Sequence, residues 1–158
     1  MGIKVVAPFE NGNDEKTKLG NFTIQFFPLE HDVVNFGMFI KHESMGSLLF
    51  LTDTCYCKYS FAKQKVNHFL IEANYSMDLV DKDKPNYEHI LQGHMSIDTT
   101  CKFLEVNNNP MLRNVILCHL SNSNSDSEDF IKRAEKVVDC PVYVAEKGLQ
   151  VSLNLIPF

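Results

Sequence analysis

The sequence predicts an α/β domain built on a mixed β-sheet with flanking helices. The chain has 158 residues and 44% of them are hydrophobic, which suits one domain with a substantial core. Short apolar runs typical of strands alternate with segments of helical spacing, an order typical of α/β folds. The formal net charge is −5, so binding to polyanions through bulk charge is not expected. The composition also excludes a disordered or disulfide-scaffold protein.

The first half of the chain is predicted to contain mainly strands. Its start, residues 4–8 (KVVAP), is strand-like, and the polar stretch Glu10–Lys18 is expected to be a loop. Alternation then predicts a strand at Phe22–Leu29 with Phe22, Ile24 and Phe26 on one face. A hairpin is expected next, formed by Gly37–His42, a turn at Glu43–Ser47, and Leu48–Thr52.

The second half alternates between strands and helices. Its expected elements, in order, are a buried strand His68–Ala73, a helix Asp98–Val106 capped by Ser96, a strand Asn114–Cys118, a polar loop Ser121–Ser127, a helix reaching about Val138, a strand Val142–Ala145 and a terminal strand Leu149–Leu155. In the second helix, Phe130, Ala134 and Val137 or Val138 are expected to face inward. Pro141 ends that helix and Gly148 turns the chain into the last strand.

Compartment signals favour a cytoplasmic protein without a membrane span. The first eight residues, MGIKVVAP, form too short an apolar run for a signal peptide. No apolar run of 18 residues exists in the chain, so no transmembrane helix is expected. The five cysteines are odd in number and irregularly spaced, which is typical of reduced thiols. Zinc binding by cysteine is the minor alternative, because no second pair completes the Cys55–Cys57 pair.

Three residues that could bind a metal follow apolar strands directly. His31 comes after FTIQFFPLE, Asp53 after LLFLT and His119 after NVILC. Ligand groups in α/β folds collect at the carboxyl ends of strands, and His and Asp are ligand types that divalent metals use. A structural role is the usual explanation for one such histidine and stays the main one from spacing alone, but three strand-end groups together add a metal site as the alternative.

Three further polar residues lie near these candidates in the pattern. His94 directly precedes an expected helix N-cap, and at that place it is either a surface residue or a histidine of lowered pKa. Glu72 and Asn74 end the strand HFLIEAN. A carboxylate there could orient nearby histidines, and the alternative for Glu72 is an ion pair with a lysine.

Taken together, the ordered motifs resemble the C-terminal half of the metallo-β-lactamase fold, in its phosphodiesterase and nuclease branch. The motifs are Pro-Leu-Glu-His31-Asp32 followed by Asn35-Phe36-Gly37, then Leu51-Thr52-Asp53-Thr54, Ile71-Glu72-Ala73-Asn74-Tyr75, Gly93-His94-Met95-Ser96 and Leu117-Cys118-His119-Leu120-Ser121. The separations also agree, with 22 residues from His31 to Asp53 and 25 from His94 to His119. The resemblance covers about residues 20–155.

One motif of that family has no counterpart in this sequence. The principal metal motif H-x-H-x-D-H should precede His31, and residues 1–30 contain no histidine. The resemblance therefore implies that residues 1–158 form a single, partial domain, the C-terminal half of an αββα sandwich. It further implies a sheet face that is open to a partner, either a second copy or a chain that supplies the first half.

The resemblance also implies roles for particular residues. Two divalent ions, Zn²⁺ or Mn²⁺, would lie about 3.5–4 Å apart in a complete site, with Asp53 bridging them and His31 and His119 each binding one. His94 would be the catalytic residue that donates to the phosphoryl group or leaving oxygen. The residues expected to contact substrate or support the ligands are Asp32, Glu72, Asn74, Ser121 and Asn124. A helix-capping role is the favoured alternative for the last two.

Two classes of function follow from these expectations. The first is a metal-dependent phosphodiesterase or nuclease half, weakly active or inactive alone, that acts once a second polypeptide supplies H-x-H-x-D-H. The second is a non-catalytic interaction domain that forms homo-oligomers and binds no metal tightly. A small cytoplasmic α/β protein with unrelated histidines would require the five ordered motifs to be coincidental.

Overall fold

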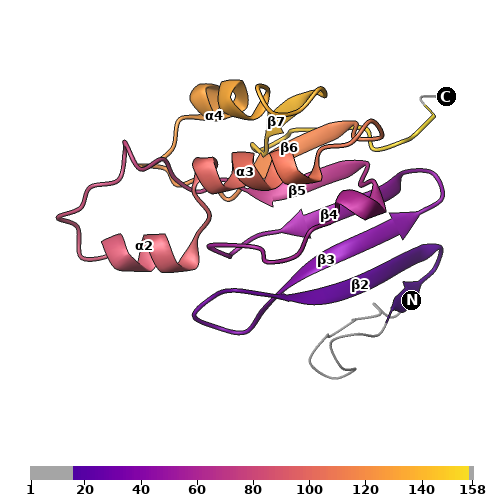
Figure 1. Cartoon of the computed structure of the whole chain (residues 1–158), viewed down its shortest axis with the longest axis horizontal. Coiled ribbons are helices and arrows are strands. Elements are labelled where there is room, and N and C mark those ends of the chain that lie inside the picture. The colour runs from indigo at the N-terminus through magenta and orange to yellow at the C-terminus, as the bar shows by residue number, and fades with distance from the viewer. Residues whose placement is uncertain (1–15, 157–158) are drawn as a thin grey trace.

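In the described part of the chain, seven strands form one sheet, and they lie in the order in which they occur in the sequence (Figure 1). The computed structural model describes residues 16–156. The strands are β1 (Thr17–Leu19), β2 (Phe22–Leu29), β3 (Asn35–His42), β4 (Gly46–Leu51), β5 (His68–Glu72), β6 (Asn114–Cys118) and β7 (Val142–Val144). The helices are the short 3₁₀ helix η1 (Ala62–Gln64), α2 (Tyr87–Gly93), α3 (Ile97–Asn107) and α4 (Ser127–Ala134). The predicted mixed sheet is therefore confirmed.

The pairing pattern places several strand ends at one edge of the sheet. Strands β1 to β4 pair antiparallel, and β4 to β7 pair parallel. Because β2 and β4 both pair antiparallel with β3, β2 runs in the same direction as the four parallel strands. The carboxyl ends of β2, β4, β5 and β6 therefore meet at the same edge.

The buried core lies on one face of the sheet, under α3 and α4. A row of strand residues in register, Phe39, Leu49, Phe69 and Val115, points to this face, and so does the next row of Leu51, Ile71 and Leu117. The helices contribute Ile97, Phe103, Leu104, Phe130 and Ala134 to the same cluster. Figure 1 shows α3 and α4 beside strands β5 to β7, whereas α2 stands apart beyond the end of the sheet.

The opposite face of the sheet is also apolar but only half-buried. One row runs in register across six strands and consists of Phe26, Met38, Phe50, Leu70, Ile116 and Tyr143. A second row begins with Ile24, Ile40 and Leu48. Except for Ile116, these side chains keep partial solvent exposure, and none belongs to the buried core clusters of the described chain. We call these nine residues the open face.

Helices α3 and α4 begin where the sequence predicts, and their capping explains why. The hydroxyl of Ser96 accepts a hydrogen bond from the backbone N–H of Thr99 at the start of α3. At α4 the carboxylate of Asp126 accepts from the N–H groups of Glu128 and Asp129. Such caps satisfy backbone donors that have no partner inside the helix. The expectation that Ser121 or Asn124 caps α4 is wrong, because Asp126 does so.

Three sequence predictions of secondary structure are wrong. The stretch Leu149–Leu155 is not a strand; its backbone instead meets single groups, with Leu155 N–H donating to the Ser44 carbonyl and the Asn114 amide donating to the Ser152 carbonyl. Helix α4 ends at Ala134 rather than near Val138, where the chain tightens into a turn. Part of the expected loop Glu10–Lys18 belongs to β1, which pairs with β2.

Other predictions are confirmed or cannot be followed. Phe130, Ala134 and Val138 are buried as expected. The strand-like KVVAP segment and residues 10–15 of the expected loop lie outside the described residues. None of the five cysteines is in a disulfide bond. Among the described helices, none is both long and apolar enough to cross a membrane.

Candidate metal centre

The strand-end residues singled out in the sequence meet at one edge of the sheet. Asp53 follows β4, Glu72 is the last residue of β5 and His119 follows β6. His94 joins them from the junction between α2 and α3, as the residue directly after α2. The parallel pairing of β4, β5 and β6 is what brings these groups together from distant parts of the chain.

Glu72 is the buried centre of this group. Its side chain is completely buried, and its Oε1 lies 2.8 Å from Nδ1 of His94 and 3.0 Å from Nδ1 of His119. The other oxygen, Oε2, accepts a hydrogen bond of 2.9 Å from the backbone N–H of Thr54. Since each Nδ1 faces Glu72, the Nε2 atom of each ring is left for another partner. A carboxylate that orients two histidines is typical of support around a metal site, and the alternative lysine ion pair is not what the structure shows.

Asp53, His94 and His119 form a group suited to a divalent metal. One ligand atom from each of these residues lies within 4.8 Å of the others. Two imidazoles and one carboxylate are a donor set that catalytic zinc uses. The residues therefore fit a divalent cation, although the donor set does not identify which one.

The backbone is strained at two of these three residues. Asp53 has φ 54° and His119 has φ 57°, both in the left-handed region. This conformation costs an L-residue about 1–2 kcal/mol, and such strain clusters at functional sites. The only other described non-glycine residue with positive φ is Lys65, after η1.

His31 and Asp32 form the neighbouring part of the cluster, together with a residue that the sequence analysis missed. The ring of His31 lies 6.1 Å from that of His94, measured between centroids, and Asp32 makes an ion pair with His31. His89 of α2 lies 5.8 Å from the His94 ring, and its Nδ1 is 3.8 Å from an oxygen of Asp32. His31 and His89 both reach the space beside Gly93. The sequence patterns did not single out His89, which lies in α2 ahead of Gly93 and His94.

Burial shifts the pKa values of the two innermost groups in opposite directions. Removal from water raises the pKa of Glu72 to about 8, since burial disfavours the charged carboxylate. Burial, followed by the proximity of His119, lowers the pKa of His94, so the neutral imidazole is favoured. A divalent cation bound beside Asp53 would oppose the shift of Glu72, because a nearby positive charge favours the ionised carboxylate.

The remaining candidates lie around His119. The Asn74 amide donates a 2.6 Å hydrogen bond to the His119 carbonyl. Ser121 lines an open hollow of about 460 Å³ together with His119, and its hydroxyl accepts from the amide of Asn124. Asn124 itself is buried and its carbonyl accepts from the N–H of Ser76. Ser121 is therefore placed to meet a ligand, whereas Asn124 supports the loop.

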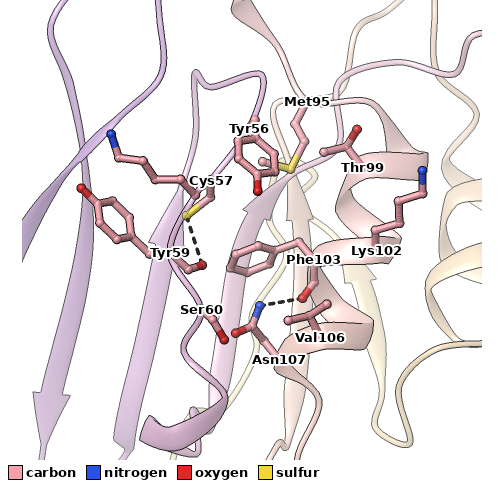
Figure 2. Close-up of a pocket in the computed structure, with 11 residues that line it drawn as sticks. Tyr56, Cys57, Tyr59, Ser60, Met95, Thr99, Lys102, Phe103, Val106 and Asn107 are labelled. Carbon is pink, nitrogen blue, oxygen red and sulfur yellow. Dashed lines mark hydrogen bonds between the residues drawn. The ribbon is translucent and has the colours of Figure 1, made fainter.

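A second hollow lies away from these histidines. It measures about 430 Å³ and lies between the 56–60 loop and α3, as Figure 2 shows. Its lining is dominated by aromatic and aliphatic groups such as Tyr56, Met95 and Phe103, with Lys102 at its margin. None of the clustered histidines or carboxylates lines it, so this hollow is separate from the histidine cluster.

Comparison with solved structures identifies the fold. The chain superposes on the metallo-β-lactamase fold protein YhfI from Bacillus subtilis with a TM-score of 0.67, 21% identity, 87% of this chain covered and 52% of that one. For yeast PDE1 the TM-score is 0.61 at 13% identity, with 87% of this chain and 48% of that one covered. For isothiocyanate hydrolase from Delia radicum gut bacteria the TM-score is 0.62 at 15% identity, with 98% of this chain and 60% of that one covered. No family model matches the sequence, and no curated protein matches it.

The fold and the cluster at its strand ends define a protein of the metallo-β-lactamase fold. Human tRNase Z, short form, also matches, with a TM-score of 0.54, 17% identity and 88% of this chain covered. The chain spans about half the length of the structures it matches. The expected fold is thus confirmed, and a metal centre is in keeping with it.

Proposed function

We propose that this chain is the second half of a metal-dependent hydrolase that cleaves phosphodiesters. The observation that carries the proposal is the convergence of Asp53, His94 and His119 around buried Glu72. Yeast PDE1 and human tRNase Z bear names of phosphodiester-cleaving enzymes, which favours this substrate class. The name of the isothiocyanate hydrolase points to a different substrate, so the phosphodiester class depends on the first two.

Each residue of the cluster has a part in this proposal. Asp53, His94 and His119 would hold a divalent metal such as Zn²⁺ or Mn²⁺, and His31 would complete the set on the side of Asp32. When bound, the metal lowers the pKa of water and neutralises charge on phosphate oxygens. Glu72 holds Nδ1 of His94 and His119, so that Nε2 of each ring faces the open site. Ser121, beside His119, is placed to donate a hydrogen bond to substrate.

His94 has a second assignment within the same proposal. As the catalytic residue, it would donate a proton to the leaving oxygen instead of binding metal. The lowered pKa of His94 favours the neutral imidazole at neutral pH, so in this assignment the ring must take up a proton before it can donate one to the leaving oxygen. The two assignments differ in outcome: His94→Ala would weaken metal binding if His94 is a ligand, and would reduce turnover at unchanged metal content if it is the acid.

The open face carries the proposal about partners. Eight of its nine apolar side chains, all but the buried Ile116, are partly exposed on the sheet face opposite the helices. Contiguous apolar surface of this kind marks interaction sites. We infer that a second sheet covers it, contributed either by polypeptide that carries the H-x-H-x-D-H ligands or by a second copy of this chain.

The test combines metal analysis with hydrolysis of bis-p-nitrophenyl phosphate. The chain is assayed with Zn²⁺ or Mn²⁺, alone and together with the polypeptide encoded directly upstream. We expect weak or no hydrolysis alone and metal-dependent hydrolysis in the complex, abolished by a combined Asp53→Ala and His119→Ala change. His42→Ala, a histidine in β3 at the opposite end of the sheet, is the matched control. A stable complex that binds metal yet hydrolyses nothing would contradict the proposal.

The open face also favours the second candidate, a non-catalytic interaction domain. In that case the chain self-associates through the open face and neither Zn²⁺ nor Mn²⁺ raises its melting temperature. A metal that stabilises the native state raises the melting temperature by mass action. Stabilisation of the intact chain, absent from the Asp53→Ala and His119→Ala variant, would decide for the metal-dependent enzyme.

A further inference from the structure

The two left-handed residues of the metal centre are both held through their carbonyl oxygens. Asp53 and His119 each follow a strand at a point where the ladder of backbone hydrogen bonds has stopped. Their positive φ values, 54° and 57°, turn the side chains out of the strand direction. A conformation that is unfavourable for L-residues persists when surrounding contacts determine it. In both cases that contact is an asparagine amide from the neighbouring part of the chain: Asn35 is the first residue of β3, and Asn74 lies two residues after the end of β5.

Asn35 holds the first of the two. Its Nδ2 donates to the carbonyl of Asp53 at 2.6 Å and to that of Thr52 at 2.8 Å. Its Oδ1 accepts from the N–H of Phe36 at 2.8 Å, which fixes the orientation of the amide. The register of β3 and β4, in which Met38 faces Phe50, brings Asn35 opposite Asp53. The side chain thus continues the pairing where the backbone ladder ends.

Asn74 holds the second in the same way. Its Nδ2 donates to the carbonyl of His119 at 2.6 Å, and its side chain is buried. Its backbone is fixed at both ends, since its N–H donates to the Met95 carbonyl and its carbonyl accepts from the N–H of Ser121. Asn74 therefore links the backbone of His119 to the residue that follows His94.

We propose that Asn35 and Asn74 are positioning residues that hold Asp53 and His119 in their left-handed conformations and so set the geometry of the metal ligands. The inference rests on the proposed metal-dependent function. An amide suits this role because its NH₂ group donates without adding charge beside a cation site. Partners of this kind around a metal site change its affinity by about 10–100-fold when they are lost.

The test measures metal affinity and backbone conformation separately. Zinc and manganese binding to the 158-residue chain is measured by titration calorimetry for the native protein, Asn35→Ala and Asn74→Ala. Backbone NMR chemical shifts and couplings of residues 53 and 119 report the left-handed conformation without any metal. Asn109→Ala is the matched control, because that amide donates to the Val66 carbonyl at 3.0 Å in another loop and its loss should lower stability alone.

The supporting result is a tenfold to hundredfold weaker metal affinity in Asn35→Ala and in Asn74→Ala. The left-handed signature should be lost at residue 53 in the first variant and at residue 119 in the second. Asn109→Ala should keep the native affinity and both signatures. If the native chain binds metal and both Asn→Ala variants, at positions 35 and 74, bind it equally well, the positioning role is overturned while the proposed function stands. If the native chain binds neither metal, the proposed function fails in its metal part, and the NMR signatures alone decide the positioning role. Should one of these two variants not fold, the other variant provides the same test.

Discussion

At the scale of single residues, the site depends on one buried carboxylate that serves two histidines. Glu72 has no exposed surface, and its two oxygens meet three donors: Nδ1 of His94, Nδ1 of His119 and the N–H of Thr54. Its removal would leave buried donors unpaired and release both rings. The arrangement of both histidine rings therefore rests on a residue that itself faces no solvent.

Glu72→Gln tests this arrangement with almost no change of shape. One carboxylate oxygen becomes an NH₂ donor, which must then face either the N–H of Thr54 or the histidine rings. We expect a loss of stability of about 1–3 kcal/mol in urea unfolding and a loss of metal affinity of about 10–100-fold in calorimetry. Glu105→Gln, an exposed carboxylate on α3, should change neither. Unaltered metal affinity in Glu72→Gln would show that Glu72 does not support metal binding.

A second residue-scale prediction concerns His68 and pH. This completely buried histidine lies 3.1 Å from the Met45 carbonyl through Nε2 and 3.2 Å from the Asn114 amide through Nδ1. Burial lowers its pKa below the usual 6.5, so the folded state holds the neutral ring. Stability that depends on this ring is therefore fully present above pH 6.5 and declines as the pH falls toward the folded-state pKa.

The measurement is urea unfolding at pH 8, 6.5 and 5.5 for the native chain and His68→Gln. Between the two lower values the native chain should lose up to about 1.4 kcal/mol per pH unit relative to the variant, the equivalent of one proton. The variant should be less stable at pH 8, because it loses buried contacts, and the difference should narrow on acidification. Parallel pH profiles would show that the His68 ring is not held neutral.

At the scale of secondary-structure elements, the sequence predicted what short-range patterns determine. Strand Phe22–Leu29 has the predicted bounds, and the N-cap Ser96 is where the pattern places it. The tail Leu149–Leu155 keeps its alternating burial, yet it is no strand because its backbone meets isolated groups instead of a neighbouring strand. Alternating apolar residues indicate which side of a segment is covered. A β-strand additionally requires a neighbouring strand close enough to form a ladder of backbone hydrogen bonds.

In the candidate site, too, the sequence predicted residues marked by local patterns and missed those whose role depends on distant contacts. His31, Asp53 and His119 could be selected because each follows an apolar strand. His89 and Asn35 could not, since neither ends a predicted strand and their roles depend on how α2 and β3 lie against the other elements. Contacts made by side chains across the fold leave little trace in local sequence patterns.

Gly37 tests a packing requirement within the sheet. It pairs with Phe27, and a Cβ at this glycine would lie 2.5 Å from the Phe27 ring and 3.1 Å from Leu51. The ring has little freedom to move, because Phe61 lies 5.1 Å away between centroids. Gly37→Ala should therefore cost about 1–3 kcal/mol in urea unfolding. Combining it with Phe27→Leu should recover part of the loss, and a wholly additive double variant would contradict the steric explanation.

At the scale of the whole molecule, the sheet has two apolar faces, and within residues 16–156 helices cover only one of them. The face under α3 and α4 holds the core, while the open face carries Phe26, Met38, Phe50 and Leu70 only half-buried. The same sheet carries the candidate metal centre at the edge where its strands end. Covering the open face with further polypeptide would therefore also enclose the neighbouring site, which links the proposed partner to the proposed activity.

Phe50→Lys tests whether the open face is an interface between copies of this chain. Phe50 lies in the middle of the six-residue row, between Met38 and Leu70, so a charge there would oppose burial of the face against any apolar surface. If the chain self-associates through this face, sedimentation velocity should show a dimer or larger species for the native chain and mainly monomer for Phe50→Lys, with unchanged circular dichroism. Val106→Lys, on exposed α3 surface away from the open face, should sediment like the native chain. A native chain that stays monomeric would contradict self-association and leave a separate polypeptide as the proposed partner, in which case Phe50→Lys should abolish capture of that polypeptide.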